Sequence, residues 1–100
     1  MASRSEVNHN EAEQRFELAA GGKTAVAAYR MEGDSISFTH TVVPEEMEGQ
    51  GIGSRLVRAA LDESRRRGFK VVPLCSFVKG YIERHPDYQD LLGAPPSPRA

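Results

Sequence analysis

Three glycines occupy alternate positions in the segment GQGIGS, residues 49 to 54, where an apolar helical pattern begins. Backbone N–H groups at the start of a helix lack intrahelical partners, and the helix dipole adds positive potential there. Glycine leaves these N–H groups uncovered and permits the backbone angles of an anion-binding loop. The spacing is therefore compatible with a loop that binds a phosphate or diphosphate. A glycine-rich turn that only joins a strand to a helix is the open alternative.

Two common kinds of nucleotide-binding loop do not fit this segment. A nucleotide-hydrolysing P-loop ends in Gly-Lys followed by Ser or Thr, whereas residues 51 to 54 are Gly-Ile-Gly-Ser. A dinucleotide-binding fold places its glycines near the start of a long α/β chain. Here they lie in the middle of a chain of 100 residues, and too little sequence follows.

Cys75, the only cysteine, is the first candidate for covalent chemistry. We expect it at the C-terminal end of a strand, just before a helix begins, where a thiolate would be stabilised. There it could act as a nucleophile or as an acid toward a leaving thiolate. An isolated cysteine is also commonly an inert thiol that fills space, here beside Phe77.

His40 is the candidate base, because a histidine can take up a proton near pH 7. Strand alternation places it on one face with Ile36, Phe38 and Val42, so a partly buried structural histidine is an equal alternative. A β-bulge would turn the side chain either way. Lys79 could reach a phosphate, and a solvated lysine is its alternative interpretation.

Strands with alternating apolar residues precede the glycine segment. RFELAA, KTAVAAYRM and SISFTHTVV are separated by Gly21-Gly22 and Gly33-Asp34, which are typical hairpin turns. Pro44 ends the third strand, because it has no N–H group to donate to a sheet. The pattern predicts an antiparallel β-meander of three strands.

A helix, a strand and a second helix are predicted after the glycines. The helical period runs from Ile52 to Arg67, and Gly68 is placed as a helix stop. FKVVPLC is typical of a short buried strand. Residues 76 to 84 are predicted to be helical, with Phe77, Tyr81 and Val78 directed inward.

This order of elements predicts one α/β (α+β) domain over residues 13 to 92. The meander is followed by a β-loop-α-β crossover, which should be right-handed, and by a C-terminal helix. Residues 1 to 12 are polar, and residues 93 to 100 are rich in proline. Both end segments are expected to be flexible.

Composition excludes several classes of protein. The net charge of −1 argues against a nucleic-acid binder that relies on bulk charge. A single cysteine cannot form an internal disulfide, and no apolar run approaches the length of a membrane span. We therefore expect a cytoplasmic protein without a membrane partner, and assign no residue to a metal.

The runs HTVVPEEMEGQGIGSRLV and GFKVVPLCSFVKGYIERHPDYQDLL resemble the GNAT superfamily of acetyl-CoA-dependent N-acetyltransferases, and most closely its small single-domain YjdJ-type branch. The resemblance covers roughly residues 10 to 92. The superfamily signature, Gln/Arg-x-x-Gly-x-Gly/Ala, falls on residues 48 to 53. The resemblance implies a minimal GNAT-like fold that uses acetyl-CoA or coenzyme A.

Site residues follow from the same resemblance. The backbone of Val42 and Val43 would pair with the pantetheine arm, and Cys75 would face the thioester where the next strand splays away. The diphosphate would be held by a loop made of Gly49, Gln50, Gly51, Ile52, Gly53 and Ser54.

Two departures from the family pattern bear on function. Glu48 stands where the signature has Gln or Arg, and a carboxylate is unfavourable beside a diphosphate. The tight Gly21-Gly22 turn leaves no room for the two helices that wall the acceptor site in larger members.

The sequence thus predicts an N-acetyltransferase that moves an acetyl group from acetyl-CoA to an amine, either a small molecule or a protein lysine or N-terminus. The alternative is a non-catalytic module that binds or senses coenzyme A. The sequence does not identify the acceptor.

Overall fold

A computed structural model of the chain describes residues 7–49 and 51–93. The strands and helices follow the order that the sequence predicts, with one additional strand at the start. In chain order the elements are β1 (Val7–Asn10), β2 (Arg15–Ala20), β3 (Lys23–Glu32), β4 (Ser35–Val42), η1 (Glu45–Met47), α1 (Ile52–Arg67), β5 (Lys70–Pro73), α2 (Ser76–Arg84) and η2 (Pro86–Leu91).

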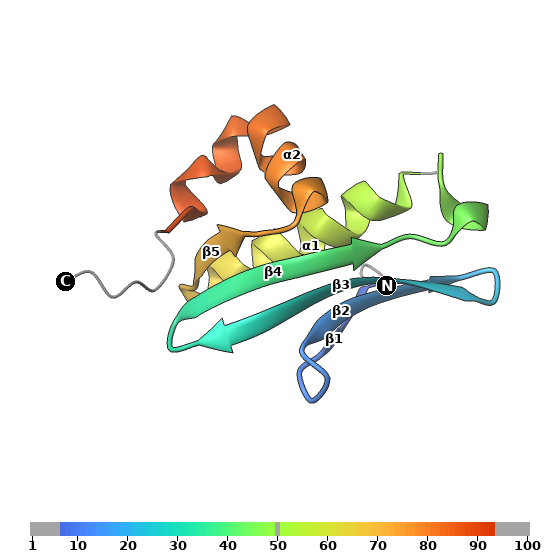
Figure 1. Cartoon of the computed structure of the whole chain (residues 1–100), viewed down its shortest axis with the longest axis horizontal. Coiled ribbons are helices and arrows are strands. Elements are labelled where there is room, and N and C mark those ends of the chain that lie inside the picture. Colours follow the sequence, from blue (N-terminus) through green and yellow to red (C-terminus); the bar gives the residue numbers. More distant parts are fainter. Residues whose placement is uncertain (1–6, 50, 94–100) are drawn as a thin grey trace.

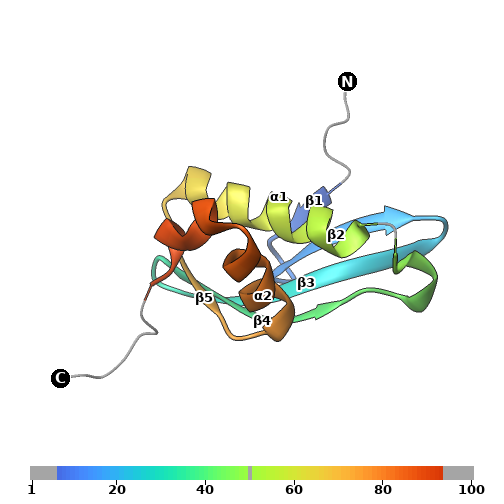
Figure 2. The same cartoon turned by 90° about the horizontal axis from the view of Figure 1, so that it is seen from above.

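The five strands form a single sheet in the order β1-β2-β3-β4-β5. The first four are antiparallel neighbours, and β5 lies parallel to β4 after the α1 crossover. Both α1 and α2 lie on one face of the sheet (Figures 1 and 2). The predicted mixed α/β class, meander and crossover are therefore confirmed.

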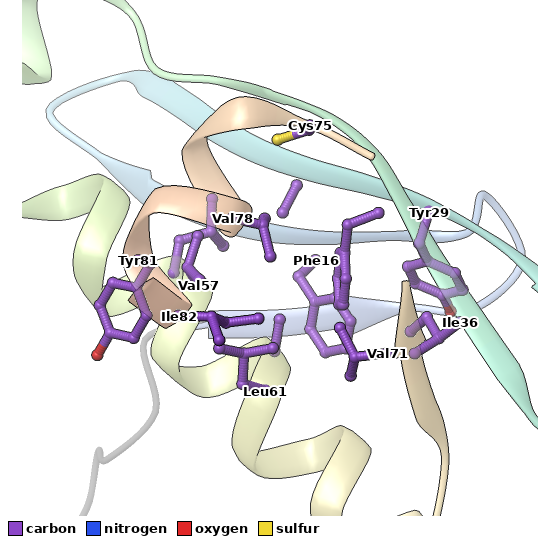
Figure 3. Packing of buried hydrophobic residues seen from close by; sticks show 14 of the residues in the cluster. Phe16, Tyr29, Ile36, Val57, Leu61, Val71, Cys75, Val78, Tyr81 and Ile82 are labelled. Atoms are coloured by element: carbon purple, nitrogen blue, oxygen red, sulfur yellow. The ribbon is translucent and has the colours of Figure 1, made fainter. Parts of the chain in front are cut away.

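The core lies between this face of the sheet and the two helices (Figure 3). The tight Gly21-Gly22 turn, in which both glycines have positive φ, sets the register of β2 and β3. Alternate strand residues consequently point the same way and meet the apolar faces of the helices. The largest fully buried side chains include Leu18, Ile36, Phe38, Leu56, Leu61, Val71, Val78 and Ile82.

Helix α1 has the bounds that its apolar period predicts. Gly68 adopts a left-handed conformation (φ 75°), and its N–H bonds back toward the carbonyls of Ser64 and Arg65. Phe69 N–H donates to the Ser64 carbonyl at 2.9 Å. These bonds satisfy carbonyls that the helix end would otherwise leave unpaired, which explains why the helix stops there.

The prediction of a flexible segment over residues 1 to 12 is wrong for Val7–Asn10, which pairs with β2. Four residues are too few to produce a clear period-two pattern. The strand is held by tertiary contacts: the His9 ring stacks on Phe16 at 4.0 Å, and its Nε2 lies 2.6 Å from the Tyr29 hydroxyl. The folded part of the described chain therefore begins at Val7 rather than at residue 13.

Phe77 was predicted to point inward, but its side chain is 38% exposed. The buried stripe of α2 is made by Val78 and Tyr81, as predicted, together with Ile82. Helical periodicity allows Phe77 or Ile82 to complete this stripe over so short a segment, and packing against the sheet selects Ile82. At the other end, residues 94–100 of the predicted tail lie outside the described residues.

The buried contacts of His9 predict a pH dependence of stability. Burial lowers the pKa of His9 below its usual 6.5, against an opposing effect of Glu11. Below pH 6.5 the unfolded chain therefore binds a proton more readily than the folded chain. The contribution of His9 to stability should be complete above pH 6.5 and should fall as the pH drops through the folded-state value.

Chemical denaturation at pH 7.5 and pH 5.5, on the unmodified protein and on His9→Gln, measures this effect. We expect the free energy of unfolding to fall more between the two pH values in the unmodified protein. Contributions from the rest of the chain are common to both proteins and cancel in the comparison. Equal losses in the two proteins would contradict the assignment.

Candidate active site

The segment between β4 and α1 makes a loop in which two of the three glycines have left-handed backbone angles. Gly49 has φ 84°, and Gly51, which precedes the helix, has φ 73°. Apart from the adjacent residues, no atom of the described chain lies within 4 Å of where a Cβ would stand at either position. Packing therefore does not demand glycine here, but the left-handed backbone favours it strongly. Gln50 lies outside the described residues.

This loop opens onto a cavity of about 170 Å³. Among the described residues no side-chain hydrogen bond caps α1 at Gly51, and N–H groups at a helix N-terminus that lack such a cap can bind an anion. The cavity collects five of the six predicted diphosphate-loop residues, together with three others. Its lining consists of Val43, Glu48, Gly49, Gly51, Ile52, Gly53, Ser54 and Phe77.

Gly53 differs from the other two glycines of the motif. It is buried within α1, and a Cβ at this position would stand 2.4 Å from Cζ of the Phe77 ring. A contact that short is impossible without movement of the ring. Glycine at this position therefore accommodates the close approach of an aromatic side chain, and it does not serve an unusual backbone angle.

Cys75 lies where the β4–β5 pairing ends. Phe38 is opposite Pro73, the last residue of β5, and its carbonyl accepts hydrogen bonds from the N–H groups of both Leu74 (3.1 Å) and Cys75 (3.0 Å). The chain then turns into α2, with Cys75 just before its first residue (Figure 3). Beyond Phe38, β4 pairs with β3 but not with β5.

A β-bulge in β4 decides which side chain faces the thiol. Phe38 pairs with Tyr29 and His40 with Ala28, so Thr39 is an extra residue on β4. The insertion reverses the alternation of the strand after Phe38. Thr41 consequently points toward Cys75, and the distance from its Oγ1 to the cysteine Sγ is 3.3 Å.

His40 therefore does not share a face with Ile36 and Phe38, and this part of the alternation prediction is wrong. Its side chain is exposed, and its Nδ1 lies 3.4 Å from Thr39 Oγ1. Val42 is likewise 54% exposed. The bulge is the physical reason, since it shifts every following residue of the strand to the other face.

The structure thus brings some of the predicted residues together and separates others. Val43 and Phe77 line the cavity at the loop, and each lies two positions from a member of the Thr41–Cys75 contact. Lys79 is exposed on α2, where its N–H bonds the Cys75 carbonyl at 3.0 Å. Sequence reasoning missed Thr41, because no residue type in β4 indicates that the strand contains a bulge.

Other features of the described residues bear on the class of site. No group of three or more His, Cys, Asp or Glu side chains in residues 7–49 and 51–93 is placed to hold a metal ion. In the same residues, no helix is long and apolar enough to cross a membrane. The connection that follows the first strand is the short turn at residues 11–14, and the next is Gly21-Gly22, so neither contains a helix.

A glycine loop at a helix N-terminus, beside a strand edge that its neighbour leaves, is the arrangement that the resemblance to the GNAT superfamily implies. The chain matches the family of GCN5-related N-acetyl-transferases over residues 15–91. It belongs to that family. The predicted membership of the GNAT superfamily is therefore confirmed.

Individual relatives agree with the family. An NMR solution structure of a GCN5-like protein from Staphylococcus aureus is similar with a TM-score of 0.71 and 28% sequence identity, covering 95% of this chain and 94% of that one. The human protein NATD1 is 30% identical over 83 residues, which are 80% of this chain and 74% of NATD1. The chicken (Gallus gallus) NATD1 is 30% identical over 84 residues.

The Thr41 contact predicts an effect on the reactivity of the thiol. A hydroxyl that donates to sulfur stabilises the thiolate, which is the reactive form. Thr41→Val removes that donor with little change in volume. One hydrogen bond is worth about 1 kcal/mol, so the rate of Cys75 alkylation by iodoacetamide at pH 7.5 should fall roughly fivefold.

Thr41→Ser keeps the hydroxyl and should alkylate at nearly the unmodified rate. Thr39→Val is the matched control, because it removes a hydroxyl from the bulge that does not contact the sulfur. Equal alkylation rates for Thr41→Val and the unmodified protein would show that the contact does not act on the thiol.

Proposed function

We propose that the protein is an N-acetyltransferase that uses acetyl-CoA as donor and an amine as acceptor. The supporting observation is the arrangement of the cavity. It is lined by the N-terminus of α1 and by Val43 and Phe77, each of which lies two positions from a member of the Thr41–Cys75 contact. A diphosphate at the helix N-terminus and a thioester near the thiol would be two parts of one ligand, coenzyme A.

The residues present fit this ligand in two respects. Glycine leaves the N–H groups at the N-terminus of α1 uncovered, and the helix dipole favours a diphosphate there. The edge of β4 that β5 leaves after Phe38 presents backbone groups that suit the amides of a pantetheine arm. The proposed contacts are the backbone of Val42 and Val43, the amides of residues 49 to 54, and Lys79 toward a phosphate.

Acetyl-CoA supplies an activated acetyl thioester when bound. In one route, Cys75 Sγ forms a bond to the acetyl carbon, the thioester bond breaks, and the thiol proton passes to the departing thiolate. The amine then bonds to the acetyl carbon, the bond from Sγ to that carbon breaks, and the amine proton returns to Sγ. In the other route, the amine bonds directly to the acetyl carbon, the thioester bond breaks, the Cys75 thiol protonates the departing thiolate, and the amine proton restores the thiol.

His40 remains the proposed base for the amine. Its exposed position on β4, adjacent in sequence to Thr41, lets it exchange protons with solvent. The acceptor is proposed to be a small amine, a protein lysine or an N-terminus, reached through an open surface. Cytoplasmic location belongs to the same proposal.

The second candidate is a module that binds coenzyme A without turnover. It is favoured by Glu48, whose side chain lines the diphosphate cavity. The absence of helices between the first strands of the described chain, which would wall an acceptor site, favours it too.

Acetyl-CoA labelled on its acetyl group separates these possibilities. We expect incubation without amine to give an intact mass increased by one acetyl group, and Cys75→Ala to lose the adduct. Thiol release with a panel of amines tests direct transfer. Binding of coenzyme A with neither an adduct nor thiol release would establish the non-catalytic module instead.

The position of Glu48 predicts that its charge weakens binding of the ligand. Glu48→Gln removes the carboxylate from the cavity that should receive the diphosphate. At about 4 Å in water, two charges interact by about 1 kcal/mol, so Kd for coenzyme A should fall roughly fivefold at low salt. The gain should shrink at high ionic strength, where exposed charges are screened.

Isothermal titration at two salt concentrations measures this change. Glu45→Gln is the control, because Glu45 is exposed on η1 and does not line the cavity. A gain of the same size in both variants would assign the effect to overall charge rather than to Glu48.

A further inference from the structure

We infer that Phe77 is a positioning residue that fixes the first turn of α1 relative to Cys75; the inference rests on the proposed function. The two reactive features of the site are carried by different helices. The diphosphate would be bound at the start of α1, whereas Cys75 lies at the start of α2. A transfer reaction requires a defined separation between them.

The contact between Phe77 and Gly53 connects these two helix starts directly. Phe77 lies in the first turn of α2 and Gly53 in the first turn of α1. A Cβ at Gly53 would stand 2.4, 3.1 and 3.2 Å from Cζ, Cε2 and Cε1 of the ring. All three are atoms at the far end of the side chain, so the tip of the ring rests on the bare Cα of the glycine.

Core packing does not account for this aromatic residue. Phe77 is 38% exposed, whereas the neighbouring Val78 and Ile82 are 1% and 2% exposed and belong to the buried cluster. The ring instead lines the loop cavity together with Val43. Phe77 is thus a large apolar side chain that stays partly in water and rests on a glycine in the first turn of another helix. Such a contact is well suited to setting the distance between the starts of α1 and α2.

The three glycines of the loop have two different roles. Gly49 and Gly51 shape the loop through their backbone angles, while Gly53 receives the ring. A Cβ at Gly53 should push the ring outward and release the constraint between the helices. Without the ring, the three nearest atoms that the Cβ would meet are gone, so we expect the added methyl to have little further effect.

Four proteins test this coupling: the unmodified chain, Phe77→Ala, Gly53→Ala and the double variant. Each is assayed for thiol release from saturating acetyl-CoA and from S-acetyl-N-acetylcysteamine, which lacks the nucleotide and diphosphate. A misplacement of about 1 Å can cost up to 100-fold in rate. We expect each single variant to lower the rate with acetyl-CoA roughly tenfold, with the rate for the short thioester unchanged.

The double variant should be no slower than Phe77→Ala, because the added methyl group occupies space that the ring has left. In Phe77→Ala, Kd for coenzyme A should change less than about twofold, since positioning acts on the reaction and not on the diphosphate contacts. Leu74→Ala is the matched control: Leu74 is 64% exposed, adjoins Cys75 and does not line the cavity. It should behave like the unmodified protein.

Three results would overturn the inference. Equal losses for the two donors in Phe77→Ala would indicate general damage to the thiol site. Additive losses in the double variant would show that the ring–glycine contact is not the coupling. If the unmodified protein releases no thiol, or shows no preference for acetyl-CoA over the short thioester, the proposed function itself fails and the positioning role fails with it.

Discussion

The carbonyl of Phe38 organises the candidate site, because it is where β5 separates from β4. It accepts hydrogen bonds from two successive N–H groups, those of Leu74 and Cys75, so the pairing of the strands stops and the chain turns into α2. The thiol is thereby fixed at the start of a helix, and the edge of β4 beyond Phe38 has no partner in β5. The bulge at Thr39, the next residue, then directs Thr41 toward the thiol.

The glycine-rich segment completes the arrangement from the other helix. Its first and third glycines satisfy unrelated demands: Gly49 has a left-handed backbone, whereas Gly53 accommodates an aromatic ring. The motif is therefore both the proposed anion-binding loop and a packing interface. In a chain of 100 residues, this double use would join ligand binding to the placement of the thiol.

The helices and the loop could be predicted from the sequence because their signals are local. Gly68 ends α1 where its apolar period ends, and the loop residues are contiguous, so a correct helix start brings them together. The strand β1, the exposure of Phe77 and the bulge could not be predicted. Each depends on contacts between distant segments, such as His9 with Tyr29 or Thr41 with Cys75, and a single inserted residue was enough to exchange His40 for Thr41 beside the thiol.

The central claim is that main-chain N–H groups at the start of α1 bind the diphosphate of coenzyme A. The most direct measurement is an NMR titration of the ¹⁵N-labelled protein, in which ¹H–¹⁵N correlation spectra follow the amide signals. Coenzyme A is added to one sample, and pantetheine, which lacks the diphosphate, to another. We predict that coenzyme A produces the largest amide shifts at Gly49, Gly51, Ile52, Gly53 and Ser54, and that pantetheine leaves these signals nearly unchanged. Signals at these five amides that remain unmoved by millimolar coenzyme A would contradict the account.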